Sequence, residues 1–350
     1  MNYLICQDWI NTSNNHAGMK YLCSRLVELY PDTYKSFVIT DYVGIYKSQN
    51  RIINILNTYS AKFKHKFKEI KILNILRKNV VPGDNIILME YMDGTYSMLQ
   101  FAQVAKKFFK NIKVYALVHL TPGKLEHIII SRNKFNALIK PIDKFFTLGS
   151  SLTQYLISKG LAENKIYTTF HYVDEYYYKE NPVVSQKIPT VIAMGNQARN
   201  IQLLKLIVKD NPNVNFIICQ GIQHFEPLFQ DVSNVALISF VPEAELKSYM
   251  DQADISLNVM EDTIGSNVIV TSLAMGLAMI CSDVGSIRDY CDDSNTFFCN
   301  TIKEYNDAIY ELTHNPNKLY LMKQSAYAQG KKLSINNFSK DLICGIYDHN

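Results

Sequence analysis

The chain has 350 residues, of which 47% are hydrophobic and 19% are charged, with a formal net charge of +4 at pH 7. This length and composition suit two domains with ordinary cores and exclude a fibrous or disordered protein. No apolar stretch approaches the roughly 20 residues that span a bilayer, and residues 1–9 enter a strand pattern instead of a signal peptide. The sequence therefore predicts a cytoplasmic protein that is either soluble or bound at the inner face of the membrane.

Short apolar runs alternate with amphipathic helical stretches along the whole chain, a pattern typical of parallel α/β layers. The strands expected in the first half are residues 3–6, 36–39, 85–89, 113–118, 144–147 and 165–168. Those expected in the second half are residues 190–194, 215–219, 235–238, 255–259, 278–282 and 296–298. The strands and the helices between them predict an α/β protein with two Rossmann-like sheets in sequence.

A polar segment with Pro182 and Pro189 interrupts this alternation and is the best candidate for a linker. We therefore expect a first domain over residues 1–182 and a second over residues 183–332. Residues 336–347 predict a helix with an apolar side, within a C-terminal segment 333–350.

The two halves of the chain differ in charge. Residues 1–180 contain 24 Lys and Arg against 14 Asp and Glu, a balance of +10, which leaves 12 against 18, or −6, for the rest. The excess is densest around Phe63, Phe67 and Ile70, which share one helical face. The surrounding basic residues are Lys62, Lys64, Lys66, Lys68, Lys71, Arg77 and Lys78. Such a helix either contacts an anionic membrane or is a solvated face of a helix packed on its own sheet.

A second basic cluster combines Phe108 and Phe109 with Lys106, Lys107, Lys110 and Lys113. The pI of about 8.5 is moderate, and no nucleic-acid-binding module is recognisable, so we expect no nucleic-acid partner. The seven cysteines are scattered without a C-x-x-C pair. They are interpreted as reduced core residues, and no metal site is expected.

Residues 261–285 carry the most informative pattern. Glu261 and Asp262 fall just past the carboxyl end of an expected strand, where open α/β sheets place their ligands. Gly265 and Ser266 follow at a helix start, where backbone N–H groups can hold an anion. The alternative is an ordinary βαβ unit with a Ser/Asn cap and Gly276 as its C-cap.

Arg199 is the best charged candidate for binding a phosphate group. It follows the turn Met194-Gly195-Asn196 at the start of a helix, where a guanidinium can grip phosphate oxygens bidentately. The alternative is an exposed arginine at a helix start with no ligand.

Two features of the first domain could also contribute chemistry. A polar loop with His16, Gly18 and Met19 follows the first strand, and the strand 113–118 delivers His119 to a carboxyl end. A histidine at a strand end can equally be structural.

The segment 255–285 resembles the donor half of retaining GT-B glycosyltransferases of the E-x7-E type, similar to glycosyltransferase family 4. The matching residues are Glu261 or Asp262, Gly265, the stretch 274–276 and the stretch 282–285. Residues 191–208 and 240–246 are also similar to that family, and the resemblance extends over roughly residues 140–330. It implies two Rossmann-like domains with a cleft between them and a C-terminal helix that crosses back onto the first domain.

The resemblance also implies a sugar transfer, with retention and without a bound cofactor or metal, from a UDP- or GDP-type donor. The acceptor would be a hydroxyl of a glycan or of a lipid-phosphate-linked molecule in surface polysaccharide biosynthesis. The implied catalytic residues are Glu261, His119 and Arg199. The implied donor-binding residues are Gly195, Asn196, Arg199, Val241, Glu261, Asp262, Gly265, Ser266, Asn267, Val268 and Thr271, and the implied acceptor-side residues are His16, Gly18 and Met19.

The chain departs from the family pattern at two points. The family's second glutamate, which takes the ribose hydroxyls, falls on Thr271 here. Glu261 and Asp262 match the first glutamate only if the turn is one or two residues longer.

Two alternatives to a transferase share this fold. One is a nucleotide-sugar epimerase, and the other is a catalytically silent GT-B subunit that binds a glycan or a protein partner, which Thr271 makes credible. The motifs of P-loop nucleotidases, zincins, α/β-hydrolases and nicotinamide dehydrogenases are absent from the sequence.

Overall fold

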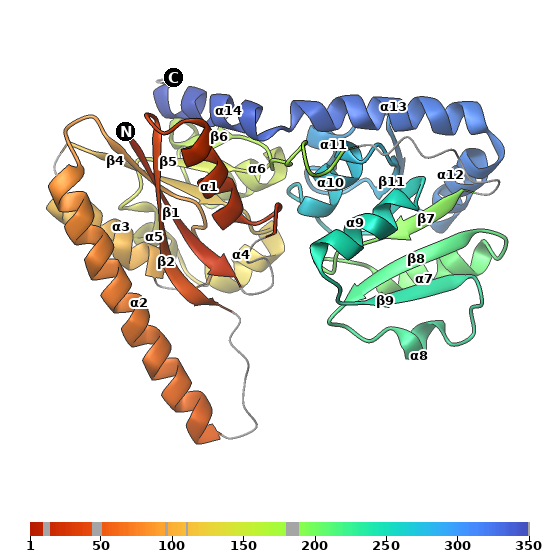
Figure 1. Cartoon of the computed structure of the whole chain (residues 1–350), viewed down its shortest axis with the longest axis horizontal. Coiled ribbons are helices and arrows are strands. Elements are labelled where there is room, and N and C mark those ends of the chain that lie inside the picture. The colour runs from red at the N-terminus through yellow and green to blue at the C-terminus, as the bar shows by residue number, and fades with distance from the viewer. Residues whose placement is uncertain (10–14, 44–50, 95–96, 110, 180–188, 349–350) are drawn as a thin grey trace. The chain divides into compact units, whose positions relative to one another are not determined.

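The computed structural model describes residues 1–9, 15–43, 51–94, 97–109, 111–179 and 189–348 (Figure 1). The chain forms two compact units. Unit 1 comprises Met1–Leu148, Leu152–Thr169 and Ser339–Asn350, and unit 2 comprises Gly149–Ser151 and Phe170–Phe338. The expected boundary near residue 183 lies outside the described residues.

Unit 1 contains a parallel sheet in the order β2-β1-β3-β4-β5-β6. Its strands are β1 (Asn2–Trp9), β2 (Tyr34–Val43), β3 (Asn85–Leu88), β4 (Lys113–Val118), β5 (Lys144–Thr147) and β6 (Ile166–Thr168). The helices between them are α1 (Met19–Leu29), α2 (Arg51–Asn79), α3 (Ser97–Phe108), α4 (Pro122–Ile128), α5 (Arg132–Ile139), α6 (Ser150–Ser158) and the 3₁₀ helix η1 (Glu163–Lys165).

Unit 2 contains a second parallel sheet in the order β12-β11-β10-β7-β8-β9. Its strands are β7 (Thr190–Ala193), β8 (Asn215–Gly221), β9 (Val235–Ser239), β10 (Ile255–Asn258), β11 (Ala278–Ser282) and β12 (Thr296–Cys299). Its helices are α7 (Ile201–Asp210), α8 (Glu226–Phe229), α9 (Glu243–Asp251), α10 (Asn267–Ala274), α11 (Ile287–Tyr290), α12 (Ile302–His314) and α13 (Pro316–Lys332).

The predicted α/β fold is confirmed, because each of the twelve expected strands is present and all strand pairs are parallel. Parallel strands are covered by helices on both faces and are therefore continuously apolar. In unit 2, Val191 and Ala193 of β7 pack into one core cluster, whereas Ile192 and Met194 pack into the cluster on the other face. This burial on both sides explains why the strands could be recognised as short apolar runs.

The C-terminal helix α14 (Ile335–Tyr347) ends against strands of unit 1. The Tyr34 hydroxyl lies 3.0 Å from Oγ of Ser339, and Tyr115 donates to the carbonyl of Ile346 at 3.2 Å. Lys144 donates to the carbonyl of Gly345 at 3.1 Å. These bonds tie the last residues of the chain to β2, β4 and β5.

Helix α2 packs against β2 and also contacts α3 (Figure 1). His65, Glu69, Ile72 and Leu76 form its buried face, and the buried Glu69 carboxylate pairs with Lys66 at 2.6 Å. Among the described residues, no helix is long and apolar enough to cross a membrane. The seven cysteines form no disulfide, and Cys344 alone among them is exposed.

Candidate functional site

The order of the strands in unit 2 reverses between β7 and β10. Both β8 and β10 pair with β7, so the chain leaves β7 toward one side of the sheet and leaves β10 toward the other. In open α/β sheets, this reversal opens a crevice outside the carboxyl ends of the two strands. The residues that follow β7 and β10 therefore mark the candidate site.

The turn after β7 brings the backbone close to helix α10. Gly195 has φ of +77°, and a Cβ atom there would lie 2.7 Å from Cγ2 of Val268. Only glycine combines this backbone conformation with such a close approach. Asn196 donates from Nδ2 to the carbonyl of Gln220 at 3.0 Å, while its buried Oδ1 has no hydrogen-bond partner among the described residues.

Arg199 is anchored from one side and unpartnered on the other. Its Nη1 donates to the carbonyl of Cys219 at 3.1 Å, and the guanidinium lies 5.9 Å from the centre of the Phe225 ring. Burial lowers the pKa of Arg199 to about 10, so the group remains charged at neutral pH. Its Nη2 is buried and has no hydrogen-bond partner within the described part of the chain.

The segment after β10 is bonded to the segment that carries Arg199. Arg199 and Met260 form an antiparallel bridge, and the amide of Glu261 donates to the carbonyl of Ala198 at 2.7 Å. Met260 is held from behind, because its amide donates to Oγ of Ser282 at 2.7 Å. The fold thus brings Arg199 and Glu261 together, and the Glu261 side chain is exposed.

A tyrosine from α11 closes the turn that leads into α10. Gly265 has φ of +87°, and a Cβ atom there would overlap the ring of Tyr290. The Tyr290 hydroxyl accepts from the amide of His171 at 2.7 Å and donates to the carbonyl of Ile264 at 3.4 Å. Asp262, half-buried, lies at the beginning of this turn.

The start of α10 offers backbone N–H groups and an amide side chain. Ser266 caps the helix by accepting from the amide of Ile269, and the first N–H groups of a helix have no partner within it. The buried Oδ1 of Asn267 lacks a partner among the described residues. Thr271, one turn later, donates its hydroxyl to the carbonyl of Asn267 at 2.6 Å. Its hydrogen is therefore used inside the helix, and the position has no carboxylate.

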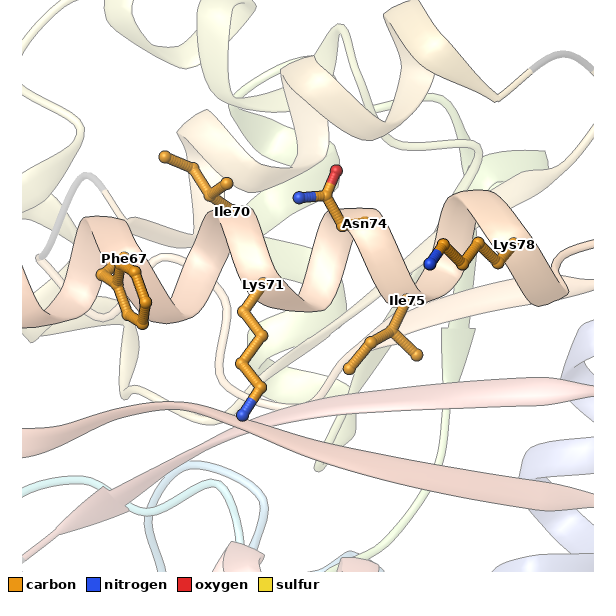
Figure 2. A pocket seen from close by; sticks show the side chains of 6 residues that line it. All are labelled: Phe67, Ile70, Lys71, Asn74, Ile75 and Lys78. Carbon is orange, nitrogen blue, oxygen red and sulfur yellow. The ribbon is translucent and has the colours of Figure 1, made fainter.

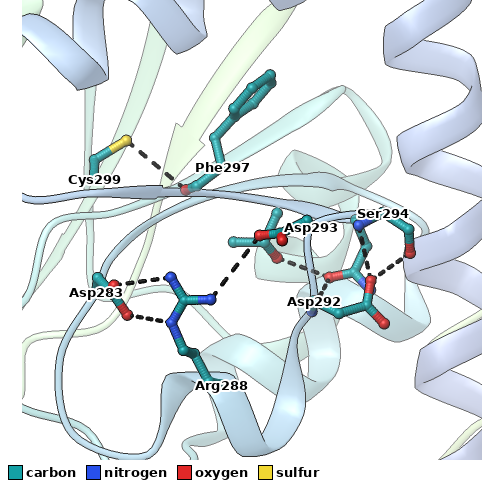
Figure 3. A network of polar contacts seen from close by, with 9 residues as sticks. Asp283, Arg288, Asp292, Asp293, Ser294, Phe297 and Cys299 are labelled. Carbon is teal, nitrogen blue, oxygen red and sulfur yellow. Dashed lines mark hydrogen bonds and ion pairs between the residues drawn. The ribbon is translucent and has the colours of Figure 1, made fainter.

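A second arginine of unit 2, Arg288 near β11, has a guanidinium that is paired with a carboxylate (Figure 3). Arg288 binds Asp283 through Nε at 2.8 Å and through Nη2 at 2.9 Å, and it lies 3.9 Å over the ring of Phe298. Its charge is compensated by a carboxylate, whereas that of Arg199 is held by a carbonyl and an aromatic ring.

The remaining predicted residues are found at three other positions. Val241 is half-buried and directly precedes Pro242, the N-cap of α9. In unit 1, the ring of His16 lies 4.7 Å from that of Tyr21, next to Gly18 and Met19 at the start of α1. His119 is half-buried directly after β4. Val241 thus belongs to unit 2, and the other two positions belong to unit 1.

The sequence reasoning missed a buried carboxylate in unit 1. Glu90 follows β3, accepts from the amide of Gln7 at 2.6 Å, and also accepts from Nε1 of Trp9. Burial raises its pKa to about 7. The sequence signal that could have identified Glu90 was its position as a charged residue directly after the apolar run 85–89. Among the described residues, no group of three or more His, Cys, Asp or Glu side chains could hold a metal ion.

Two parallel α/β units, one of which gathers polar groups at its strand-order reversal, define the GT-B architecture. Residues 189–315 match a family described as glycosyl transferases group 1. The fold is similar to that of Alr3699/HepE from Anabaena, solved in complex with UDP, at 12% identity and a TM-score of 0.72, covering 99% of each chain. The match and the fold together support a glycosyltransferase.

Two further solved structures show the same fold. Sucrose-phosphate synthase from Thermosynechococcus elongatus is 11% identical with a TM-score of 0.71, over 98% of this chain and 97% of that one. TarM from S. aureus, solved with UDP and alpha-GlcNAc-glycerol, is 15% identical with a TM-score of 0.63, over 80% of this chain and 59% of that one. No curated protein matches this chain in sequence.

Proposed function

We propose that the protein transfers a sugar from a nucleotide-sugar donor to a hydroxyl acceptor and binds the donor at the carboxyl edge of β7 and β10. One observation carries this proposal. Nη2 of Arg199 is buried beside a glycine turn at the strand-order reversal and has no partner among the described residues. An unsatisfied buried donor costs about 1–3 kcal/mol, and more if charged, so a bound anion that accepts from it recovers that free energy.

A nucleoside diphosphate supplies the anion that fits these groups. Arg199 and the N–H groups of Ser266, Asn267 and Val268 at the start of α10 would hold the diphosphate, because a helix N-terminus and a guanidinium both favour negative charge. The N–H of Gly265 already donates to Oγ1 of Thr263 at 3.3 Å, so Gly265 would shape the turn beside the diphosphate. The amide oxygens of Asn196 and Asn267, which have no partner in the part of the chain that the structure describes, would accept from hydroxyl groups. Gly195 lets the turn after β7 pack closely on Val268 of α10, and Val241 and Thr271 would complete the donor site.

The sugar would be held by the acidic residues after β10. Glu261 is exposed and fixed through its backbone, so its carboxylate is available to accept from sugar hydroxyls beside Arg199. Asp262 lies next in the same turn. We prefer a UDP donor to a GDP donor because the Anabaena neighbour was solved with UDP and also with UDP-glucose.

Charge stabilisation of the leaving diphosphate would be the main catalytic contribution. The anionic phosphate, held by Arg199, would take the proton of the acceptor hydroxyl, so no protein base is required. We propose retention of configuration because of the resemblance of residues 255–285 to retaining enzymes. In this scheme Glu261, His119 and Arg199 are the catalytic residues, and His16, Gly18 and Met19 lie on the acceptor side.

Unit 1 would bind the acceptor and unit 2 would bind the donor. The C-terminal helix within residues 333–350 would pack back on unit 1. The excess of ten positive charges over residues 1–180 favours an acceptor with a phosphate or lipid-phosphate group. Surface polysaccharide assembly at an anionic membrane would supply such an acceptor.

A second candidate function rests on Thr271, whose hydroxyl is engaged within α10 and which brings no carboxylate to the site. A GT-B subunit that binds a nucleotide or glycan without transferring sugar would be compatible with this position. It would bind a diphosphate without consuming the sugar nucleotide.

A thermal-shift screen of nucleoside diphosphates and their sugars tests the proposal, since a ligand of the folded state raises the melting temperature with its concentration. We expect a shift with UDP that Arg199→Ala reduces and Arg288→Ala leaves intact. A shift with GDP alone would correct the base, and no shift with any nucleotide would refute the donor site. Consumption of the matching sugar nucleotide in the presence of an acceptor then separates transfer from silent binding. The anomeric configuration of the product, measured by NMR, tests retention.

A further inference from the structure

Helix α2 has a second, apolar face that no described residue of unit 1 covers. Phe63 is 75% exposed, Phe67 65% and Ile70 50%, and the three side chains follow one another at helical spacing. Tyr59, one turn earlier on the same face, is also exposed. The face that packs on unit 1 is a different one, formed by His65, Glu69, Ile72 and Leu76. We call the exposed stripe of Tyr59, Phe63, Phe67 and Ile70 the outer face of α2.

Basic side chains border this outer face on both sides. Lys62 and Lys66 flank it along one edge, and Lys64, Lys71 and Lys78 flank it along the other, all of them exposed. Glu69 is the sole acidic residue between positions 51 and 79, and it is buried against Lys66. The border of the outer face therefore presents positive charge without an exposed carboxylate on the helix.

The C-terminal part of the outer face is hollowed. Phe67, Ile70, Lys71, Asn74, Ile75 and Lys78 line a groove of about 280 Å³ (Figure 2). The loop after α2 is bonded to the segment after α3, where the amide of Gly83 donates to the carbonyl of Asn111 at 3.3 Å. Phe108, which is 66% exposed at the end of α3 beside Lys107, thus lies near the same end of the unit. Lys110 lies outside the described residues.

We propose that the outer face of α2 binds the surface of an anionic lipid bilayer, with its apolar side chains at the acyl boundary and its lysines at the headgroups. An apolar stripe with lysine borders is the arrangement of interfacial helices, in which long lysine side chains reach back toward the charged surface. The inference deepens the proposed function, on which it rests for the lipid-linked acceptor.

Charge distinguishes this occupant from two others. A second copy of the chain, paired through the same face, would place lysine borders against lysine borders, because an isologous contact repeats the same patch on both sides. A nucleic acid would match the positive charge, but its phosphate backbone would not provide an apolar environment in which the stripe could be buried. An anionic bilayer satisfies both the stripe and its borders.

Vesicle flotation of the full chain tests the assignment, with phosphatidylcholine vesicles compared with mixed phosphatidylcholine and phosphatidylglycerol vesicles. We expect at least about tenfold more protein on the anionic vesicles, with binding that weakens as salt is added. Phe63→Ser combined with Phe67→Ser should reduce binding by at least about tenfold, and so should Lys62→Glu with Lys64→Glu and Lys71→Glu.

The matched control is Tyr320→Ser combined with Leu321→Ser, which removes two side chains that are 62% and 63% exposed on α13 of unit 2. This variant should float like the wild type. No flotation of the wild type, or equal flotation of the α2 variants, would overturn the proposal. A dimer in light scattering that Phe63→Ser disrupts, or retention of an RNA oligonucleotide in place of vesicles, would assign the face to another occupant and also overturn it.

The thermal shift with UDP separates this inference from the proposed function. It needs no vesicle, and flotation needs no nucleotide. A nucleotide shift in all variants with no flotation would overturn the α2 assignment alone. Flotation that depends on α2 without any nucleotide shift would leave the assignment standing and refute the donor site.

Discussion

The two sheets reverse their strand order at corresponding places, yet the two carboxyl edges carry opposite chemistry. In unit 2, the segments after β7 and β10 contain a glycine turn and the buried guanidinium of Arg199. They also contain two amide oxygens that have no partner among the described residues. In unit 1, where β1 lies beside β3, the corresponding edge contains the carboxyls of Glu90 and Asp93. One edge offers a guanidinium to an anion, and the other offers carboxyl groups, of which Glu90 has its pKa raised to about 7 by burial.

The carboxyls of unit 1 are held by donors from β1. The amide of Gln7 and the indole of Trp9 donate to Glu90, and Nε2 of Gln7 donates to Asp93. Asp8 pairs with Lys20 of α1 at 2.7 Å. A strand-order reversal thus provides only a place for a ligand. The side chains at that place determine which ligand charge is favoured.

The largest effect is expected from giving the edge of unit 2 the charge of unit 1. Arg199→Glu should lower the affinity for UDP by at least about 100-fold, because a charge-assisted donor is lost and a carboxylate faces the phosphates. Isothermal titration measures the change. The affinity of Arg199→Gln for UDP should lie between those of the wild type and Arg199→Glu. Arg288→Ala removes an arginine already bound by Asp283, so its affinity for UDP should match that of the wild type. Equal affinity in Arg199→Glu would contradict the assignment of charge.

A glycine substitution tests whether the turn of unit 2 depends on its close packing. Gly265→Ala should lower the free energy of unfolding by about 3 kcal/mol, because the new Cβ combines a strained backbone with overlap of the Tyr290 ring. Gly83→Ala in unit 1 is the control. Gly83 also has positive φ, at +95°, but a Cβ there meets no atom within 4 Å. Its cost should be about 1 kcal/mol, from backbone strain alone. Similar urea-denaturation losses for both would argue against a tightly closed turn at Gly265.

The carboxyl of Glu90 predicts a pH dependence that unit 2 does not share. The pKa of Glu90 rises on folding from 4.5 to about 7, so between these values the native state holds a proton that the unfolded state has released. Stability from this group is therefore full below pH 4.5 and is lost as the pH rises through about 7, by about 3 kcal/mol in total. Urea denaturation at acidic and alkaline pH should show this fall in the wild type.

Glu90→Gln should remove that fall, although its absolute stability is lower because one of the two donors loses its acceptor. In unit 2, burial lowers the pKa of His171 from 6.5 to about 4, so its contribution changes in the other direction. Stability from His171 is present above pH 6.5 and is lost as the pH falls toward 4. An unchanged fall in Glu90→Gln would assign the alkaline loss to another group.

The smallest effect is expected at Thr271. Thr271→Val removes the hydroxyl that donates to the carbonyl of Asn267, at a cost of about 1 kcal/mol or less in the free energy of unfolding. UDP affinity should change by less than about threefold, because this hydrogen is used within α10. A loss beyond tenfold would show that the hydroxyl accepts from the nucleotide.

The positions of the strands and of the loops after β7 and β10 were predictable because they depend on local pattern. Buried parallel strands are apolar runs, and Gly195, Arg199 and Glu261 follow such runs directly. Their partners were not predictable, because Tyr290 reaches Gly265 from 25 positions along the chain and Phe225 reaches Arg199 from 26. Glu90 was missed because its partners Gln7 and Trp9 come from another strand of the sheet. The exposure of Phe63 and Phe67 could likewise be decided only by packing, since α2 has two apolar faces.

The central claim is that unit 2 binds a diphosphate at its β7–β10 edge, and calorimetric titration of the wild type with UDP and with uridine tests it most directly. We expect UDP to bind and uridine to bind at least about 100-fold more weakly, because Arg199 and the start of α10 act on the phosphates. Equal affinity for uridine, or no heat with UDP, would contradict it.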